Sequence, residues 1–390
     1  MGKLVLGVLD AGLEERSGGA YNLLEGLLKT AGNFEILVKV IGTSVDLRKS
    51  NYSNNINIVS LNKSSGLLKK ITKDIRALPY IGNSLGASKL GGIAEVLLAS
   101  LGSGISFGDI QWWLYPHCFS PVPRLGRVAA ICYDLQHYTY PEHFPWIIRR
   151  MRQEGEASLS NVEKVICISN FTRDMLLNRY PQFENKTVAI YPPVNIEANP
   201  LEIENERNRI KKSFQKPFSI YPAVDWPHKN HILLLDAAKI LRKDIGPEFQ
   251  IILTGQRRRG TWLRDQIKNY GVSDVVVDLG QVSPAVLIAF YREARALLFP
   301  SLYEGFGIPL VEAMLFGVPI IASNCTAIPE ITRNAAVLCN PTMSEDFSEA
   351  IKKMLFDNEI HAVLSKAAYE RSKIFGGANW WKTFLSNIDY

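Results

Sequence analysis

The sequence predicts an α/β protein made of two doubly wound domains that face each other across a cleft. Short apolar runs of strand character alternate with segments of helical periodicity along the whole chain, which is the pattern of parallel sheets covered by helices. At 390 residues the chain is too long for one ordinary core and suits two domains of nearly equal size. The stiff segment Tyr191-Pro-Pro-Val194 suits a linker, so we expect domains over residues 1–194 and 195–374.

The composition is that of a folded soluble protein, with 47% hydrophobic and 21% charged residues. The five cysteines form no CxxC pair, which indicates neither a structural zinc nor a disulfide framework and fits reduced core residues of a cytoplasmic protein. No apolar stretch approaches the roughly 20 residues that a membrane span requires. We interpret the opening run to Asp10 as a first strand rather than a signal peptide, because charged residues follow it.

The net charge of +6 is concentrated in the first half of the chain. Residues 48–89 carry eight basic residues and a single acidic one, Asp74. Apolar residues recur there at helical spacing, which predicts a short basic amphipathic helix near residues 66–77. Two interpretations stay open: a solvated helix face, or peripheral contact with an anionic membrane at its inner face.

The expected strands follow one another in two series. In the first half they lie at residues 4–9, 34–41, 57–60, 109–114, 128–133, 164–168 and 187–190. In the second half they lie at residues 218–221, 249–254, 275–279, 296–299 and 320–322, with helices at 229–242, 261–269 and 284–293 between them. Because doubly wound sheets bind ligands at the carboxyl ends of their strands, binding motifs should collect in strand-to-helix loops.

The most informative of these loops contains Glu304, and seven residues separate it from Glu312 in the helix that follows. Gly305 and Gly307 let the turn bend sharply and expose backbone N–H groups. Both carboxylates then lie near the positive end of a helix, at a place suited to a hydroxylated, phosphorylated ligand. The plainer alternative also stays open, since the helix dipole alone favours a glutamate there and Gly-Phe-Gly can be only a turn.

Two further loops offer groups that bind anions. Gly18 and Gly19 open the first helix of the chain, although paired glycines mostly serve turns. Lys229 follows Asp225 and Pro227, which we expect to begin a helix. A cation is disfavoured at that end of a helix, and a bound anion would remove the conflict.

The segment from Pro300 to Pro319 resembles the signature of the retaining family 4 glycosyltransferases, which are group 1 glycosyltransferases with the GT-B fold. Their paired glutamates have the same seven-residue gap and are followed by a Gly-x-Pro turn, here Gly317-Val318-Pro319. The resemblance implies that Glu304 and Lys229 are catalytic and that Glu312 holds the ribose of the nucleotide. It implies donor binding by Gly18, Gly19, Lys229, Gln281, Glu304, Gly305, Phe306, Gly307, Ile308 and Glu312.

The chain departs from the family's pattern at two positions. The loop Cys132-Tyr-Asp-Leu-Gln-His137 resembles the family's His-Asp-Leu segment but has Tyr133 at the usual histidine position, leaving Asp134 and His137 as acceptor-side candidates. The family's arginine five residues before the lysine is Val224 here. A basic group from residues 257–259 is a candidate replacement, with a solvated loop as the alternative.

The resemblance implies a retaining, metal-independent transfer of a hexose from a nucleoside-diphosphate sugar to a glycan or lipid-linked acceptor. It implies no metal, no cofactor and no nucleic acid partner. Residues 222–231 resemble the version found in bacterial mannosyl- and rhamnosyl-type transferases of surface polysaccharide synthesis. Residues 375–390 resemble the closing helix that packs back on the first domain in such enzymes.

Other classes of function are judged by their motifs. No GxGxxG follows the first strand and GxxxxGK[ST] is absent, which argues against a nicotinamide-dependent oxidoreductase and a phosphate-loop nucleotidase. Two alternatives stay open: a sugar-nucleotide epimerase of the same fold, and a catalytically silent sugar-nucleotide-binding subunit.

Overall fold

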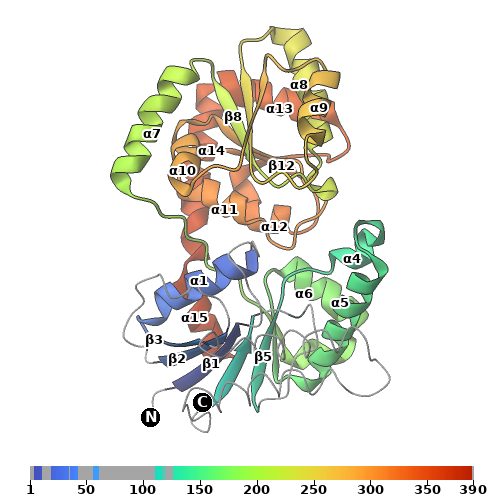
Figure 1. Ribbon diagram of the computed structural model, residues 1–390, viewed down its shortest axis with the longest axis vertical. Coiled ribbons are helices and arrows are strands. Elements are labelled where there is room, and N and C mark those ends of the chain that lie inside the picture. Colours follow the sequence, from blue (N-terminus) through green and yellow to red (C-terminus); the bar gives the residue numbers. More distant parts are fainter. Residues whose placement is uncertain are drawn as a thin grey trace, which may run out of the picture. The chain divides into compact units, whose positions relative to one another are not determined.

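The computed structural model describes residues 4–10, 19–34, 36–42, 56–60, 110–116, 118 and 126–388. The chain divides into two compact units, each built on its own parallel sheet (Figure 1). The first unit comprises Met1–Pro193 together with Gly376–Tyr390, and the second comprises Val194–Phe375. The boundaries expected from the sequence, 194 and 374, each lie one residue from these.

The first unit has a parallel sheet of seven described strands in the order β3-β2-β1-β4-β5-β6-β7. Strand order reverses between β1 and β4, which makes this a doubly wound sheet. All five residues of β5 are buried, as expected for a central strand covered on both faces. The strands are β1 (Leu4–Asp10), β2 (Ile36–Gly42), β3 (Ile56–Ser60), β4 (Trp112–Tyr115), β5 (Val128–Cys132), β6 (Lys164–Cys167) and β7 (Thr187–Ala189).

The C-terminal helix belongs to the first unit. Trp381 of α15 donates its indole N–H to the carbonyl oxygen of Leu27 in α1 at 3.1 Å, and Gly377 lies against Thr30 with no room for a Cβ. The described helices of this unit are α1 (Gly19–Ala31), α4 (Gln136–Thr139), α5 (Trp146–Ser158), α6 (Asn170–Arg179) and α15 (Gly377–Ser386). The 3-10 turns are η4 (Pro141–His143), η5 (Leu159–Asn161) and η6 (Pro181–Lys186).

The second unit has a parallel sheet of six strands in the order β10-β9-β8-β11-β12-β13. The strands are β8 (Phe218–Pro222), β9 (Gln250–Thr254), β10 (Val276–Gly280), β11 (Ala296–Phe299), β12 (Ile320–Ser323) and β13 (Ala336–Cys339). Sequence patterning does not predict β13, because it is a short edge strand in which only Cys339 is buried. Strand order reverses between β8 and β11, so the loops after these two strands meet at one edge of the sheet.

Helices cover both faces of the second sheet, with α8 packed on α13 and α11 packed on α14 (Figure 1). The helices are α7 (Pro200–Ser213), α8 (His231–Ile245), α9 (Trp262–Asn269), α10 (Pro284–Glu293), α11 (Ile308–Leu315), α12 (Ile328–Thr332), α13 (Ser344–Phe356) and α14 (Asn358–Ser372). The 3-10 turns are η7 (Pro227–Lys229), η8 (Arg333–Ala335) and η9 (Lys373–Phe375). No helix in the described part of the chain is long and apolar enough to cross a membrane.

Candidate active site

The loop between β8 and α8 is tied to the loop after β11 by Asn230. This residue has the left-handed backbone conformation (φ 55°), which asparagine tolerates better than most residues. Its side-chain amide donates to the carbonyl oxygens of Pro300 at 3.2 Å and Pro341 at 2.9 Å. The N–H of Leu302 donates to the carbonyl oxygen of His228 at 2.8 Å, so the two loops hold each other in register.

These contacts bring Lys229 and Glu304 together, although they lie 75 positions apart in the sequence. Lys229 Nζ is 2.6 Å from Glu304 Oε1, and the two side chains are only 17% and 11% exposed. The N–H of Glu304 donates to Thr326 Oγ1 at 3.1 Å, and the Tyr221 hydroxyl donates to the carbonyl oxygen of Lys229 at 2.7 Å. The ammonium and the carboxylate are therefore fixed at the mouth of the β8 and β11 loops.

Glu312 lies on α11, where its carboxylate accepts a hydrogen bond of 3.0 Å from the Tyr291 hydroxyl. Burial raises the pKa of Glu312 to about 7, although the hydrogen bond from Tyr291 acts in the opposite direction. A carboxyl group with this pKa changes its charge near neutral pH, and any ligand that donates hydrogen bonds to it favours the ionised form.

The residues between the two glutamates form the turn that begins α11. Gly307 has φ 96°, and a Cβ there would lie 2.7 Å from Leu310 Cδ1, so only glycine fits. Ile308 is the first residue of the helix, and Gly305 is partly exposed. Phe306 is buried and packs edge-on against Phe375, so its side chain belongs to the core.

Asp225 does not begin a helix as the sequence predicts, because a 3-10 turn and Asn230 precede α8. It is fully buried, and its carboxylate accepts the N–H groups of Arg258 at 2.6 Å and Arg259 at 3.1 Å. An aspartate just after a buried strand was the only signal of this role in the sequence. Asp225 therefore orders the loop after β9 rather than capping a helix.

Two arginines of the basic triplet at residues 257–259, after β9, make contacts within the protein. Arg257 binds Asp278 through Nε at 3.0 Å and the carbonyl oxygen of Ala223 through Nη1 at 3.1 Å. The Arg259 guanidinium lies 3.6 Å above the ring of Trp262. Sequence reasoning did not find the Arg257–Asp278 pair, which joins β8, β9 and β10 at the same sheet edge.

Gln281 is exposed just beyond β10, after Gly280 with φ 65°. The N–H of Gly280 donates to Asp278 Oδ1 at 3.0 Å, which fixes the turn. Gln281 thus follows a strand of the same sheet as the Lys229–Glu304 pair, but no hydrogen bond joins it to that pair.

The acceptor-side candidates lie in the first unit, in the loop after β5. Asp134 accepts a hydrogen bond of 2.7 Å from Arg152 Nη1 and another from the N–H of Gln136. His137 is 2% exposed, with Nε2 at 3.2 Å from Glu156 Oε1. Burial and the charge of Arg152 lower the pKa of His137 to about 4, and burial raises that of Glu156 to about 7.

Several predicted features fall on residues that the structure does not describe. Gly18 and the expected helix at residues 66–77 lie outside the described residues, and of the basic segment 48–89 only residues 56–60 are described. Gly19 is the first residue of α1. In the described part of the chain no cluster of three or more His, Cys, Asp or Glu residues could hold a metal ion.

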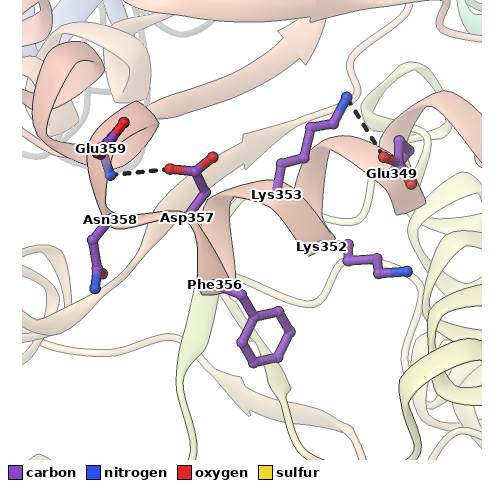
Figure 2. Close-up of a pocket in the computed structure, with 7 residues that line it drawn as sticks. All are labelled: Glu349, Lys352, Lys353, Phe356, Asp357, Asn358 and Glu359. Carbon is purple, nitrogen blue, oxygen red and sulfur yellow. Dashed lines mark hydrogen bonds and ion pairs between the residues drawn. The ribbon is translucent and has the colours of Figure 1, made fainter.

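Figure 2 shows a pocket of about 480 Å³ at the junction of α13 and α14. Polar groups that line this pocket contact other residues of the same two helices. Lys353 pairs with Glu349 at 3.5 Å within α13, and Asp357 accepts the N–H of Glu359 at 3.0 Å at the start of α14 (Figure 2). Phe356 is 53% exposed at its wall. None of the predicted site residues lines this pocket, and we assign it no ligand.

Comparison with known proteins finds similarity to glycosyltransferases. Residues 202–371 match the family model described as Glycosyl transferases group 1. O-antigen chain mannosyltransferase B of Escherichia coli is 27% identical over 278 residues, which cover 70% of this chain and 72% of that protein. O-antigen chain mannosyltransferase RfbU of Salmonella typhimurium is 26% identical over 252 residues, which cover 64% of this chain and 66% of that protein.

The fold is shared over nearly the whole chain. Sucrose-phosphate synthase of Thermosynechococcus elongatus matches with a TM-score of 0.72 over 98% of both chains, at 17% sequence identity. Two doubly wound units, each on its own parallel sheet, make up the fold that this chain shares with that enzyme. The match to the glycosyl transferases of group 1 covers residues 202–371, all of which lie in the second unit.

Proposed function

We propose that the protein transfers a hexose from a nucleoside-diphosphate sugar to a glycan or lipid-linked acceptor, with retention of anomeric configuration and without a metal ion or cofactor. The contact that carries this proposal is the partly buried Lys229–Glu304 pair. The similarity to two O-antigen mannosyltransferases supports mannose as the hexose and bacterial surface polysaccharide synthesis as the setting. The paired-glutamate signature supports membership of the retaining family 4.

The mechanism begins with an exchange of partners at Lys229. In the ligand-free protein its ammonium is neutralised by Glu304 at 2.6 Å. A donor diphosphate, with more negative charge than one carboxylate, takes over the ammonium and leaves Glu304 free to accept hydrogen bonds from sugar hydroxyls. Lys229 then stabilises the negative charge that grows on the departing phosphate, and Glu304 offsets the positive charge that develops on the sugar ring.

Retention follows if the acceptor hydroxyl enters on the face that the diphosphate leaves. A phosphate oxygen of the departing group then takes the proton of that hydroxyl, and the new glycosidic bond forms as the old one breaks. Glu312 accepts hydrogen bonds from the ribose hydroxyls, with its carboxylate oriented by Tyr291. The nucleotide is thereby anchored on α11.

The Lys353–Glu349 pair provides a matched control, because it joins the same residue types in the same unit but is about 60% exposed at both side chains. We expect Lys229→Met and Glu304→Gln each to lower kcat by roughly 100-fold or more, as for the loss of a group that stabilises transition-state charge. Lys353→Met and Glu349→Gln should keep turnover close to that of the wild type. Equal turnover in the two sets of variants would refute the catalytic role of the site pair.

The donor is identified by thermal unfolding with UDP-, GDP-, ADP- and dTDP-sugars. A single nucleotide that raises Tm in the wild type, and raises it less in Glu312→Gln, supports donor binding through the ribose. NMR of the product from that donor then reports whether the anomeric configuration is retained, and excess EDTA tests metal independence. Product of inverted configuration contradicts the retaining mechanism.

The two alternatives are separated by leaving the acceptor out. A sugar-nucleotide epimerase converts the donor without any acceptor, whereas the transferase needs one. A catalytically silent subunit binds the donor but neither epimerises it nor transfers its sugar to an acceptor. Epimerised donor in the absence of acceptor would overturn the proposed transfer.

Peripheral membrane contact through the basic segment at residues 48–89 is a separate part of the proposal. Its support is compositional: eight basic residues against a single acidic one. Sedimentation with phosphatidylglycerol vesicles, compared with phosphatidylcholine vesicles, tests it. Preference for the anionic vesicles should disappear in Lys69→Glu/Lys70→Glu, and equal binding to both vesicle types would contradict it.

A further inference from the structure

A second pocket, of about 530 Å³, lies in the first unit where α4, η4 and the start of α5 meet. It follows β5, at the carboxyl edge of the first sheet, where doubly wound sheets bind ligands. Side chains of α5 and α4 line this pocket. From α5 they are Trp146, Arg149, Arg150 and Gln153, and from α4 they are His137 and Tyr138.

The four lining residues of α5 lie on one face of the helix. Their positions, 146, 149, 150 and 153, follow the i, i+3, i+4, i+7 spacing of a single helical stripe. The core side of the helix is formed instead by Gly155 and Glu156, which are buried. Trp146 is 66% exposed, so its large apolar ring adds little to the packing of the fold.

The pocket is positively charged. Arg152, the third arginine of α5, is neutralised by Asp134 at 2.7 Å and does not line the pocket. Arg150 pairs with Glu154 at 3.0 Å, but both groups are on the surface, where such a pair contributes little. Arg149 has no ion pair with any described residue.

The nearest buried acid does not cancel this charge. Glu156 accepts the Tyr138 hydroxyl at 2.9 Å and lies 3.2 Å from His137 Nε2, behind the two α4 residues of the lining. Burial raises the pKa of Glu156 to about 7, so much of it is uncharged at neutral pH. Two guanidinium groups therefore face the pocket, and one of them, that of Arg150, pairs with the partly exposed Glu154.

This combination suits a phosphate attached to a sugar. Adjacent guanidinium groups present planar arrays of donors that match phosphate oxygens, and they keep their charge at any physiological pH. An exposed indole can cover the apolar face of a sugar ring or a short hydrocarbon, and an amide such as that of Gln153 can hydrogen-bond hydroxyls. The donor diphosphate already has its own cation in Lys229, in the other unit.

Resting on the proposed transferase function, we propose that this pocket binds the phosphate or diphosphate of the glycosyl acceptor. The acceptor is then a sugar carried on a phosphate ester, with Arg149 and Arg150 on the phosphate and Trp146 on the adjoining ring or chain. The pocket selects anionic acceptors over neutral glycans that have the same terminal sugar.

The kinetic test compares two acceptors that differ only in this group: a mannosyl diphosphate ester with a short alkyl chain, and the corresponding neutral alkyl mannoside. Arg149→Gln/Arg150→Gln should raise KM for the diphosphate acceptor about tenfold or more, since it removes charge-assisted hydrogen bonds. KM for the neutral acceptor should stay unchanged. Arg173→Gln on α6, another partly exposed arginine of the first unit, is the matched control and should change neither.

A binding measurement separates failure of this proposal from failure of the transferase assignment. Calorimetric titration with phenyl phosphate is done in a Lys229→Met background, so that the donor site does not contribute. The double arginine substitution should weaken binding about tenfold, whether or not the protein transfers sugars. If the double arginine variant binds phenyl phosphate with unchanged affinity, the phosphate site is overturned. If its affinity falls but the protein transfers no sugar, only the transferase function is refuted and the phosphate site stands.

A phospholipid headgroup is a different source of the same chemistry. We expect the wild type and the double arginine variant to sediment equally with phosphatidylglycerol vesicles. Loss of vesicle binding in the variant, with an unchanged KM for the short-chain diphosphate acceptor, would assign the pocket to the membrane surface and overturn the proposal.

Discussion

Glu312→Gln should make the ligand-free protein more stable at alkaline pH while weakening its binding of nucleotide. The substitution keeps the size of the side chain and an oxygen that can accept the Tyr291 hydroxyl, at present 3.0 Å from the carboxylate. It removes only the charge that Glu312 acquires on ionisation. Stability and binding therefore change in opposite directions for a single physical reason.

The magnitude follows from the pKa of Glu312, which burial raises from 4.5 to about 7. Because the folded-state pKa is the higher one, the stabilising contribution of the protonated group is present at pH values below 4.5 and is lost as pH rises through about 7. The gap between the two pKa values corresponds to about 3 kcal/mol. At pH 8 the variant should exceed the wild type in free energy of unfolding by up to that amount, and at pH 5 by less than about 1 kcal/mol.

Urea unfolding of both proteins at pH 5, 6, 7 and 8 measures this difference. Glu349→Gln, which replaces an exposed glutamate of the same unit, is the control and should show no comparable pH dependence. A difference between wild type and Glu312→Gln that is constant across this pH range would refute the reasoning about its ionisation.

Nucleotide binding is the second half of the prediction. Hydroxyls that donate to Glu312 favour its ionised form, so binding should release a proton near neutral pH and tighten as pH rises through about 7. Calorimetry with the best nucleotide in two buffers of different ionisation enthalpy detects this proton. Glu312→Gln should bind about tenfold more weakly and release none, since a charge-assisted hydrogen bond is lost. Unchanged affinity contradicts contact between Glu312 and the ribose.

Three further substitutions test the supports of the site. Tyr291→Phe removes the hydrogen bond that lowers the pKa of Glu312, so the pH at which nucleotide affinity is half lost should rise in a calorimetric pH series; an unchanged midpoint counts against this role. Gly255 has φ 113°, and Gly255→Ala would place a Cβ 2.5 Å from the carbonyl oxygen of Ala223. This substitution should lower the free energy of unfolding, measured in urea, by ~2 kcal/mol or more. A loss under ~0.5 kcal/mol would contradict the geometry. Asn230→Ala should lower the free energy of unfolding by ~2 kcal/mol and reduce kcat. Asn230→Gly suits the positive φ, so it measures the loss of the two side-chain amide hydrogen bonds alone. Equal unfolding free energies for the wild type and Asn230→Gly would show that those hydrogen bonds contribute nothing.

Much of the fold could be predicted from local pattern alone. Strands such as β5 and β11 are continuous apolar runs because both faces of a central parallel strand are buried. Where burial is only partial the signal fails, as at β13, which has a single buried residue. Helix α8 begins two residues later than predicted, because the left-handed conformation of Asn230 cannot be read from helical periodicity.

The sequence by itself determined the α/β class, the two series of strands and the loop that carries Glu304 and Glu312, because these depend on residue types at short spacing. Tertiary structure alone decided that Lys229 contacts Glu304 across 75 positions, that Asp225 holds the N–H groups of the β9 loop, and that Tyr291 orients Glu312. The Lys229–Glu304 contact arises where strand order reverses between β8 and β11, and that order is set by the packing of the whole sheet. The charged face of α5 follows the same rule: its spacing is visible in the sequence, but which face stays open is decided by what the rest of the unit covers.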